Sequence, residues 1–292
     1  MNKVSKAYIQ LHIAVLLFGF TAILGDLISL SALVLVWWRV LITTISLFFL
    51  IKFGKTLKTL PKALILKYMG IGVLVAIHWI TFFGAVKYSN ASICLVAMAT
   101  ASFFTSFLEP MILKKPFKPY EMVLGLMIIP GMLMVVNNID VSMQLGIWVG
   151  MLSAFLAALF AVLNKKLIDN TDAMTITFLE LGSACLFISV ILPFYFQTEN
   201  ASNFLPTQSD WFYLLILALL CTTLAYVLSL NALKHISAFA TNLTINLEPV
   251  YGIILAVFLL KENEELNAGF YIGSALIIFA VMVYPYVKKK LD

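Results

Sequence analysis

The sequence has few charged side chains. Asp, Glu, Lys and Arg together make up 11% of its 292 residues, whereas hydrophobic residues make up 62%, and a typical soluble domain is about one quarter charged. A soluble chain of this composition would lack the polar groups to cover its surface. In a lipid bilayer that need disappears, but every backbone polar group must be paired within the protein, so only helices or closed barrels can span. The long continuous apolar runs favour helices over barrel strands.

Several site signatures are also missing. The three cysteines, Cys94, Cys185 and Cys221, all fall inside apolar runs, which fits packing residues better than a disulfide framework. The sequence shows no Cys/His cluster with metal-ligand spacing and no glycine-rich phosphate loop, so we expect neither a metal nor a nucleotide cofactor. The net charge of +5 is spread over short loops rather than along one basic stripe, so we expect no nucleic-acid partner.

Apolar stretches of about 20 residues, the length that crosses a bilayer as a helix, recur along the whole chain. Ten stretches qualify, and we read the first as an uncleaved helix rather than a signal peptide. They are Tyr8–Gly25, Leu33–Ile51, Lys67–Val86, Ala91–Leu113, Tyr120–Val136, Leu145–Leu163, Ala173–Phe194, Trp211–Leu230, Ala238–Leu260 and Ala268–Val287. The predicted fold is an all-α membrane protein with ten transmembrane helices.

The lysines orient these helices. If the N-terminus is cytoplasmic and every predicted helix crosses once, sixteen lysines lie in cytoplasmic segments and only Lys87 and Lys261 lie outside. Cytoplasmic loops of membrane proteins carry such an excess of positive residues. A wrong helix count would mix the two sets, so the separation favours ten crossings with both chain ends in the cytoplasm.

Two segments of the chain resemble each other. Ala85–Ala91, between the predicted third and fourth helices, and Ala232–Ala238, between the eighth and ninth, share Ala, Lys and Ala at the same spacing. The same offset places Leu113-Lys114 on Leu260-Lys261. A similar order of matches along both halves predicts an internal repeat.

The repeat unit contains five predicted helices, which is an odd number. The second unit must therefore enter the membrane from the opposite side, which gives an inverted repeat of the kind common in secondary transporters. We expect the first unit to occupy residues 1–141 and the second to occupy 142–292.

The order of these motifs resembles the drug/metabolite transporter superfamily, and specifically its EamA-type exporters. The resemblance covers nearly the whole chain and adds Leu16–Thr21, Trp38-Arg39-Val40, Asn246–Gly252 and Leu260-Lys261-Glu262 to the repeat. It implies a multi-pass protein of the bacterial inner membrane that exports small metabolites, often amino acids or drug-like compounds.

Two ionisable residues fall at matching places in the two halves. The offset that lays Ala32 on Ala173 puts Arg39, the single arginine, opposite Glu180. An ionisable group in the hydrocarbon region costs about 2.5–3.5 kcal/mol on insertion scales, so each calls for a partner or a wet cavity. Arg39 is either a charged gate or carboxylate site, or a structural clamp between helices. A direct Arg39–Glu180 bond stays open, because the two residues lie at different depths.

Glu248 and His78 are candidates for coupling to protons. Glu248 precedes Pro249 near the middle of the predicted ninth helix. Proline disturbs the helix near Ile245, and burial of a carboxyl group favours its neutral form. His78 lies near the midplane beside Trp79, which could stack on a substrate or cover a cation. The alternative for both ionisable residues is an ordinary contact between helices.

Tyr226, Asn246 and Tyr251 are polar points on otherwise apolar helices. Such residues either read a substrate or join helices by hydrogen bonds. Glu109 lies near the cytoplasmic end of its helix, within reach of water or Lys114, and we expect it to have a structural role.

The leading hypothesis is a secondary transporter that exports a small organic solute by alternating access around a midplane cavity, with proton exchange as an option. We expect lipid as its surroundings and one chain as the functional unit. The alternatives are a membrane-embedded enzyme acting on a lipid-linked substrate, and a non-transporting assembly factor or receptor.

Overall fold

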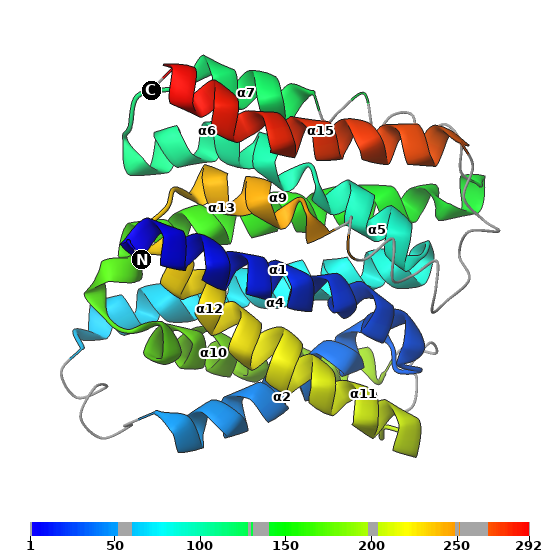
Figure 1. The fold of residues 1–292 in the computed structure, drawn as a ribbon. Coiled ribbons are helices and arrows are strands. Elements are labelled where there is room, and N and C mark those ends of the chain that lie inside the picture. Colours follow the sequence, from blue (N-terminus) through cyan, green and yellow to red (C-terminus); the bar gives the residue numbers. More distant parts are fainter. Residues whose placement is uncertain are drawn as a thin grey trace.

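The computed structural model describes residues 2–51, 60–127, 130, 140–197, 204–248, 251 and 268–291, and all regular elements in these ranges are helical (Figure 1). In chain order they are α1 (Lys3–Leu27), α2 (Ala32–Leu50), α4 (Lys62–Tyr88), α5 (Ala91–Met98), α6 (Ala101–Leu113), α7 (Pro119–Leu126), η1 (Val141–Met143), α9 (Gln144–Leu167), η2 (Ile168–Asn170), α10 (Ala173–Tyr195), α11 (Gln208–Ala218), η3 (Leu219–Leu224), α12 (Ala225–Leu233), α13 (Ala238–Ile245) and α15 (Ala268–Leu291).

Within the described residues, seven helical segments are long and apolar enough to cross a membrane. They are Lys3–Leu27, Ala32–Leu50, Lys62–Tyr88, Ala91–Leu113, Val141–Asn170, Ala173–Tyr195 and Gln208–Leu233, and they coincide with seven of the predicted spans. The predicted tenth span, Ala268–Val287, lies within α15. The predicted fifth and ninth spans run into residues outside the described ranges. The apolar helices indicate a multi-pass membrane protein.

The predicted fourth span is not one continuous helix. The Ala99 N–H is shared between the carbonyls of Leu95 and Val96, and the Thr100 N–H donates to Ala97 three residues back. This tightening ends α5, and α6 begins at Ala101. The predicted ninth span has a similar interruption, because α13 ends at Ile245.

Short polar side chains begin several of the helices. Asn90 accepts from the Ile93 N–H at 2.8 Å at the start of α5, and Asp172 accepts from the Thr175 N–H at 3.0 Å at the start of α10. Such caps satisfy amide groups that have no partner within their own helix.

Small residues let helices of the two sequence halves approach closely. The helix α4 packs against both α9 and α10, and α1 packs against α12. A Cβ atom at Gly72 of α4 would collide with the Glu180 carbonyl oxygen of α10. A Cβ atom at Gly150 of α9 would lie 2.8 Å from the Ala97 Cβ. These glycines are close-packing residues, as is common between membrane helices.

Large apolar side chains cover much of the outer surface. Phe49 is 79% exposed, Phe194 67% and Phe212 63%. Because such a surface is unfavourable in water, it fits helices whose outer faces contact lipid.

Both chain ends lie at the same side of the helix bundle (Figure 1). Lysine ammonium groups also tie helix ends together. Lys87 of α4 donates to the Ile28 carbonyl just after α1 at 2.7 Å, and Lys165 of α9 donates to the Leu233 carbonyl at the end of α12 at 2.6 Å. A cation at a helix C-terminus satisfies carbonyls and interacts favourably with the helix dipole.

Candidate functional site

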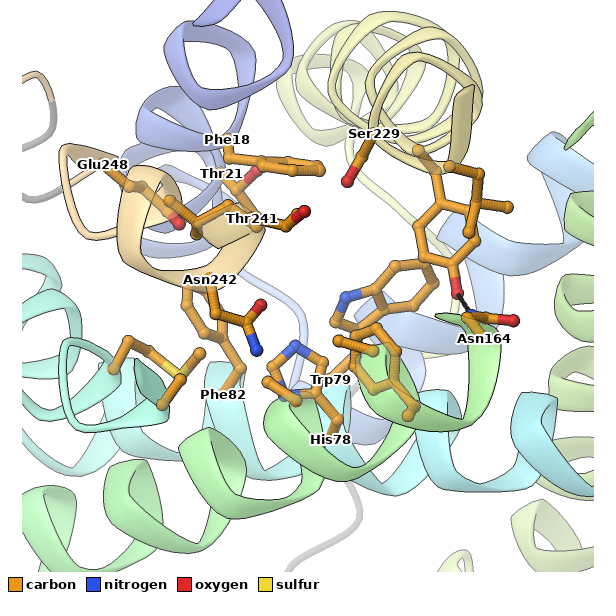
Figure 2. A pocket seen from close by; sticks show the side chains of 18 of the residues that line it. Phe18, Thr21, His78, Trp79, Phe82, Asn164, Ser229, Thr241, Asn242 and Glu248 are labelled. Atoms are coloured by element: carbon orange, nitrogen blue, oxygen red, sulfur yellow. Dashed lines mark hydrogen bonds between the residues drawn. The ribbon is translucent and has the colours of Figure 1, made fainter. Parts of the chain in front are cut away.

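A cavity of about 100 Å³ lies among α1, α2, α4, α5, α6, α9, α12 and α13. Figure 2 shows the labelled side chains around it: Phe18 and Thr21 from α1, His78, Trp79 and Phe82 from α4, Asn164 from α9, Ser229 from α12, and Thr241, Asn242 and Glu248 from α13 and the residues after it. Helices from both sequence halves thus enclose the cavity, which is lined by aromatic rings and scattered polar groups.

Arg39 lines this cavity and is 1% exposed. Its guanidinium carbon lies 3.9 Å from the centre of the Trp79 ring and 5.4 Å from that of Phe83. Its Nε donates to the Thr222 hydroxyl at 2.6 Å. The Nη1 atom is buried and has no hydrogen-bond partner. Trp79 therefore covers a cation that belongs to the protein itself.

Thr222 belongs to η3, a short π-helical segment within the eighth predicted span. Its hydroxyl donates to the Leu217 carbonyl, five residues back, while it accepts from Arg39. The Thr223 hydroxyl makes the equivalent bond to the Ala218 carbonyl at 2.9 Å. Single π-turns inside α-helices occur often at functional sites. Here the widened turn carries the oxygen that fixes the arginine.

Glu180 is fully buried but does not line the cavity. One carboxylate oxygen, Oε2, accepts from the Tyr226 hydroxyl at 2.6 Å and from the Asn164 amide at 3.3 Å. Tyr226 and Asn164 both line the cavity, so Glu180 acts on it through them. No ion pair joins Glu180 to Arg39 within the described part of the chain.

His78 lines the cavity and also joins two helices. Its Nδ1 lies 2.9 Å from the Ser153 carbonyl oxygen and 2.8 Å from the Ser153 hydroxyl, and that hydroxyl donates to the His78 carbonyl at 2.9 Å. These contacts hold α4 against α9. The histidine thus forms an ordinary contact between helices and also reaches the cavity.

Glu248 is 6% exposed and reaches the cavity from the segment after α13. Pro249 lies outside the described residues. Asn246 does not line the cavity, and its amide donates to the Ser102 hydroxyl of α6 at 2.9 Å. Tyr251 lies apart from the cavity and packs against an apolar cluster of α1 and α12 that contains Leu11 and Ala232. The predicted set therefore divides into cavity-lining and helix-joining residues.

A ladder of polar contacts joins α6 to α13. Ser102 accepts from Asn246, Thr105 accepts from Asn242 at 2.7 Å, and the Glu109 carboxylate accepts from the Phe239 N–H at 2.7 Å. Glu109 also forms an ion pair of 3.5 Å with Lys115, the residue after the Lys114 that was one of its two expected partners.

The ladder could have been found from the sequence in part. Ser102, Thr105 and Glu109 are spaced by three and four residues, so they share one face of α6. Their partners on α13 cannot be identified without knowing which face of that helix meets them.

No group of three or more His, Cys, Asp or Glu residues within the described ranges is arranged to hold a metal ion.

Comparison with known proteins shows the family to which this chain belongs. The family model of the EamA-like transporter family matches residues 5–137 and 144–284. The chain belongs to the EamA-like transporter family. A protein described as uncharacterized transporter YxxF of Bacillus subtilis strain 168 is 23% identical over 98% of this chain and 91% of its own length. Another from the same organism, uncharacterized transporter YetK, is 31% identical, but the match spans 46% of this chain and 40% of that protein.

A solved crystal structure matches this EamA-like chain over 99% of both chains with a TM-score of 0.73 and 14% sequence identity, which shows a shared fold. The family and the named relatives point to a membrane transporter rather than an enzyme. The alternative of a membrane-embedded enzyme is therefore set aside.

Proposed function

We propose that this EamA-like protein is a secondary transporter that exports small organic metabolites by alternating access around the cavity. The observation that carries the proposal is the cavity itself. It is lined by α1, α2, α4, α5 and α6 from residues 1–141 and by α9, α12 and α13 from residues 142–292. A rocking motion of one half against the other would change access to it. Because a single chain supplies both halves, the proposed functional unit is the monomer.

The proposed arrangement has ten crossings, cytoplasmic chain ends and two inverted five-helix repeats. Side-chain pairs support the repeat. The offset that places Ala85 on Ala232 also places Trp79 on Tyr226, and Arg39 corresponds to Glu180. Arg39 lies over Trp79, and Glu180 accepts from the Tyr226 hydroxyl. Each half thus pairs a charged residue with an aromatic residue on the following span.

The polar ladder between α6 and α13 supports alternating access. Asn242 contributes to the cavity wall and to the ladder, and Glu109 stands at its other end near Lys115. The C-terminal end of α6 and the start of α13 lie toward the side of the chain ends in Figure 1. Release of a solute on that side would require α6 and α13 to separate. Three hydrogen bonds that are individually weak between membrane helices, about 0.6–2 kcal/mol each, suit a contact that must open and close.

Glu248 and His78 are the proposed coupling residues, because both are buried ionisable groups on the cavity wall. A proton taken up by Glu248 on one side and released on the other would drive export against a solute gradient.

The test begins with a screen of metabolites exported by cells with and without the protein, followed by flux of the hits in proteoliposomes. An imposed pH gradient should accelerate flux, and Glu248→Gln should remove this acceleration. Asp140→Asn is the matched control, because Asp140 is an exposed acid outside the spans. Flux that does not change with the pH gradient would contradict proton coupling. Normal gradient-driven flux in Glu248→Gln would contradict the assignment of Glu248 as a coupling residue. If none of the hits is transported in proteoliposomes, the proposed transport function is wrong.

A further inference from the structure

Four buried polar atoms around the cavity lack a hydrogen-bond partner: Thr21 Oγ1, Arg39 Nη1, Asn164 Oδ1 and Glu180 Oε1. All four residues are at most 5% exposed. Three of them line the cavity, and the fourth supports two lining residues. Buried polar groups in proteins are rarely left unpaired, because the loss of hydration is costly. Their concentration at one cavity therefore describes what a ligand should supply.

At the end of the cavity where Arg39 lies, a ligand must supply a hydrogen-bond acceptor. The Nε of Arg39 is occupied by Thr222, and the face of the guanidinium is covered by Trp79. What remains is an N–H donor of a permanent cation at a cavity wall. A carboxylate is the complement of such a donor, because charge-assisted bonds to guanidinium groups are the strong ones.

At the end of the cavity where Asn164 lies, a ligand must supply a hydrogen-bond donor. The Tyr226 hydroxyl and the Asn164 amide nitrogen both point to the same oxygen of Glu180. The carbonyl of Asn164, a lining residue, is left as an acceptor, and the second Glu180 oxygen is left unpaired behind the cavity wall. The rings of Trp79 and Tyr226 lie 6.2 Å apart, so the contacts run from Arg39 across these two rings to Glu180. The cavity thus has a donor end and an acceptor end, joined by an aromatic wall.

The wall and the volume limit the body of the ligand. Phe18, Phe82 and Phe160 line the cavity together with the Trp79 and Tyr226 rings. A volume of about 100 Å³ is well below that of a site for drug-sized molecules. One flat ring fits this description, since aromatic rings stack favourably against each other.

We propose that the cavity binds a small aromatic carboxylate that carries a hydrogen-bond donor at the end opposite to the carboxylate. The proposal rests on the transport function above and specifies its substrate class. In it, Arg39 binds the carboxylate, the carbonyl of Asn164 meets the donor, Glu180 holds Tyr226 and Asn164 from behind the cavity wall, and Thr222 is a positioning residue that fixes the guanidinium.

The first test compares ligands on the purified full-length protein in detergent, without transport. The probes are para-hydroxybenzoate, benzoate, para-hydroxybenzamide and para-hydroxybenzylamine, and thermal stabilisation over a concentration series gives apparent affinities. We expect para-hydroxybenzoate to bind about ten- to a hundredfold more tightly than the amide, because the amide lacks the charge. Benzoate should be roughly three- to tenfold weaker, because it lacks the donor.

Three results overturn the proposal: equal binding of the amide, tighter binding of the amine, or no binding of any probe. Equal binding of benzoate removes the donor requirement and overturns that part. These outcomes are distinct from failure of the transport function. A protein that exports neutral or cationic metabolites remains a transporter without this substrate class, and one that binds the acid but moves nothing retains the site without the function.

Variants test the positioning role of Thr222. Thr222→Val removes the oxygen that accepts from Arg39 but keeps a similar shape, and it should lower the preference for the acid over the amide at least severalfold. Thr222→Ser should restore the preference. Thr223→Val is the matched control, because it loses the equivalent π-helical bond to Ala218 without touching Arg39. A Thr222→Val protein with the full preference, or the same loss in Thr223→Val, contradicts the role.

Discussion

Two glycines on α4 give a sharp test of helix packing. Gly72 is buried against α10, where an added Cβ would collide with the Glu180 carbonyl oxygen and the Ser183 hydroxyl and lie 2.7 Å from the Glu180 carbonyl carbon. Gly70, two residues earlier, is exposed and has no atom within 4 Å of the corresponding position. The Ser183 hydroxyl at this contact also donates to the Met69 carbonyl at 2.9 Å, so the collision disturbs a bond between the helices.

The pair Gly72→Ala and Gly70→Ala separates packing from helix propensity. Both gain the same backbone preference, about 1 kcal/mol, because alanine replaces glycine in one helix. Only Gly72→Ala must push two backbones apart, and overpacking costs about 1–3 kcal/mol. The difference between the variants should therefore be about 1–3 kcal/mol, with Gly72→Ala the less stable.

Thermal unfolding of the two purified variants in the same detergent measures this difference. At roughly 2–4 °C per kcal/mol for a chain of this size class, the melting temperatures should differ by between about two and twelve degrees. Melting within one degree of each other would refute the close contact between α4 and α10. A loss of the same size in Gly70→Ala would attribute the effect to something other than packing.

Three further predictions concern polar contacts at helix ends. Asp172→Ala should cost about 1 kcal/mol at neutral pH by removing the cap of α10. Partial burial alone would raise the pKa of Asp172, but hydrogen bonds from Thr175 outweigh it and lower the pKa. Melting curves against pH should therefore show the full stability advantage of the wild type over Asp172→Ala above the ordinary pKa near 3.8. The advantage should disappear as the pH falls through the lowered pKa. Asp210→Ala should cost about 2–4 kcal/mol in the same assay, because it leaves the Ser29 N–H and hydroxyl without their acceptor; an effect under 0.5 kcal/mol would contradict this. Glu109→Ala should speed hydrogen exchange at the start of α13, where its carboxylate accepts an amide N–H, and unchanged exchange there would remove the cap.

The positions of the helices followed from the lengths of the apolar runs. The predicted span Ala173–Phe194 differs from α10 by one residue, and Leu33–Ile51 from α2 by one at each end. The largest differences are at the starts of α1 and α4, which begin at Lys3 rather than Tyr8 and at Lys62 rather than Lys67. Lysine side chains can reach the interface from inside a helix, so the helix continues beyond its apolar run.

The interruptions did not follow from composition. The turn at Ala99 and Thr100 contains neither proline nor glycine, and the residues of η3 are ordinary helix residues. Both features depend on hydrogen bonds of the backbone and of threonine hydroxyls that compete with the regular helical pattern. Such competition is decided by neighbouring helices.

The candidate site was predictable where charge alone was decisive. Arg39 and Glu248 stood out as ionisable residues within apolar runs, and both line the cavity. Glu180 stood out equally but lies behind the wall, and Tyr251 lies elsewhere. Thr222 gave no signal, since one threonine among many is informative only when its neighbour across the helix interface is known.

Of the lysines that close helix ends, Lys165 belongs to the predicted cytoplasmic set and therefore has two expected roles at different times. While the chain enters the membrane, a positive charge helps to decide which side a loop stays on. Once the helices have assembled, Lys87 and Lys165 are bonded to carbonyls of other helices. Replacement of Lys165 by glutamine is therefore expected to alter both an insertion signal and a contact between assembled helices, whereas replacement of Lys87, in the predicted outer set, alters the contact alone. Arginine would preserve the positive charge that acts during insertion, but its planar guanidinium group has a different reach from that of an ammonium group.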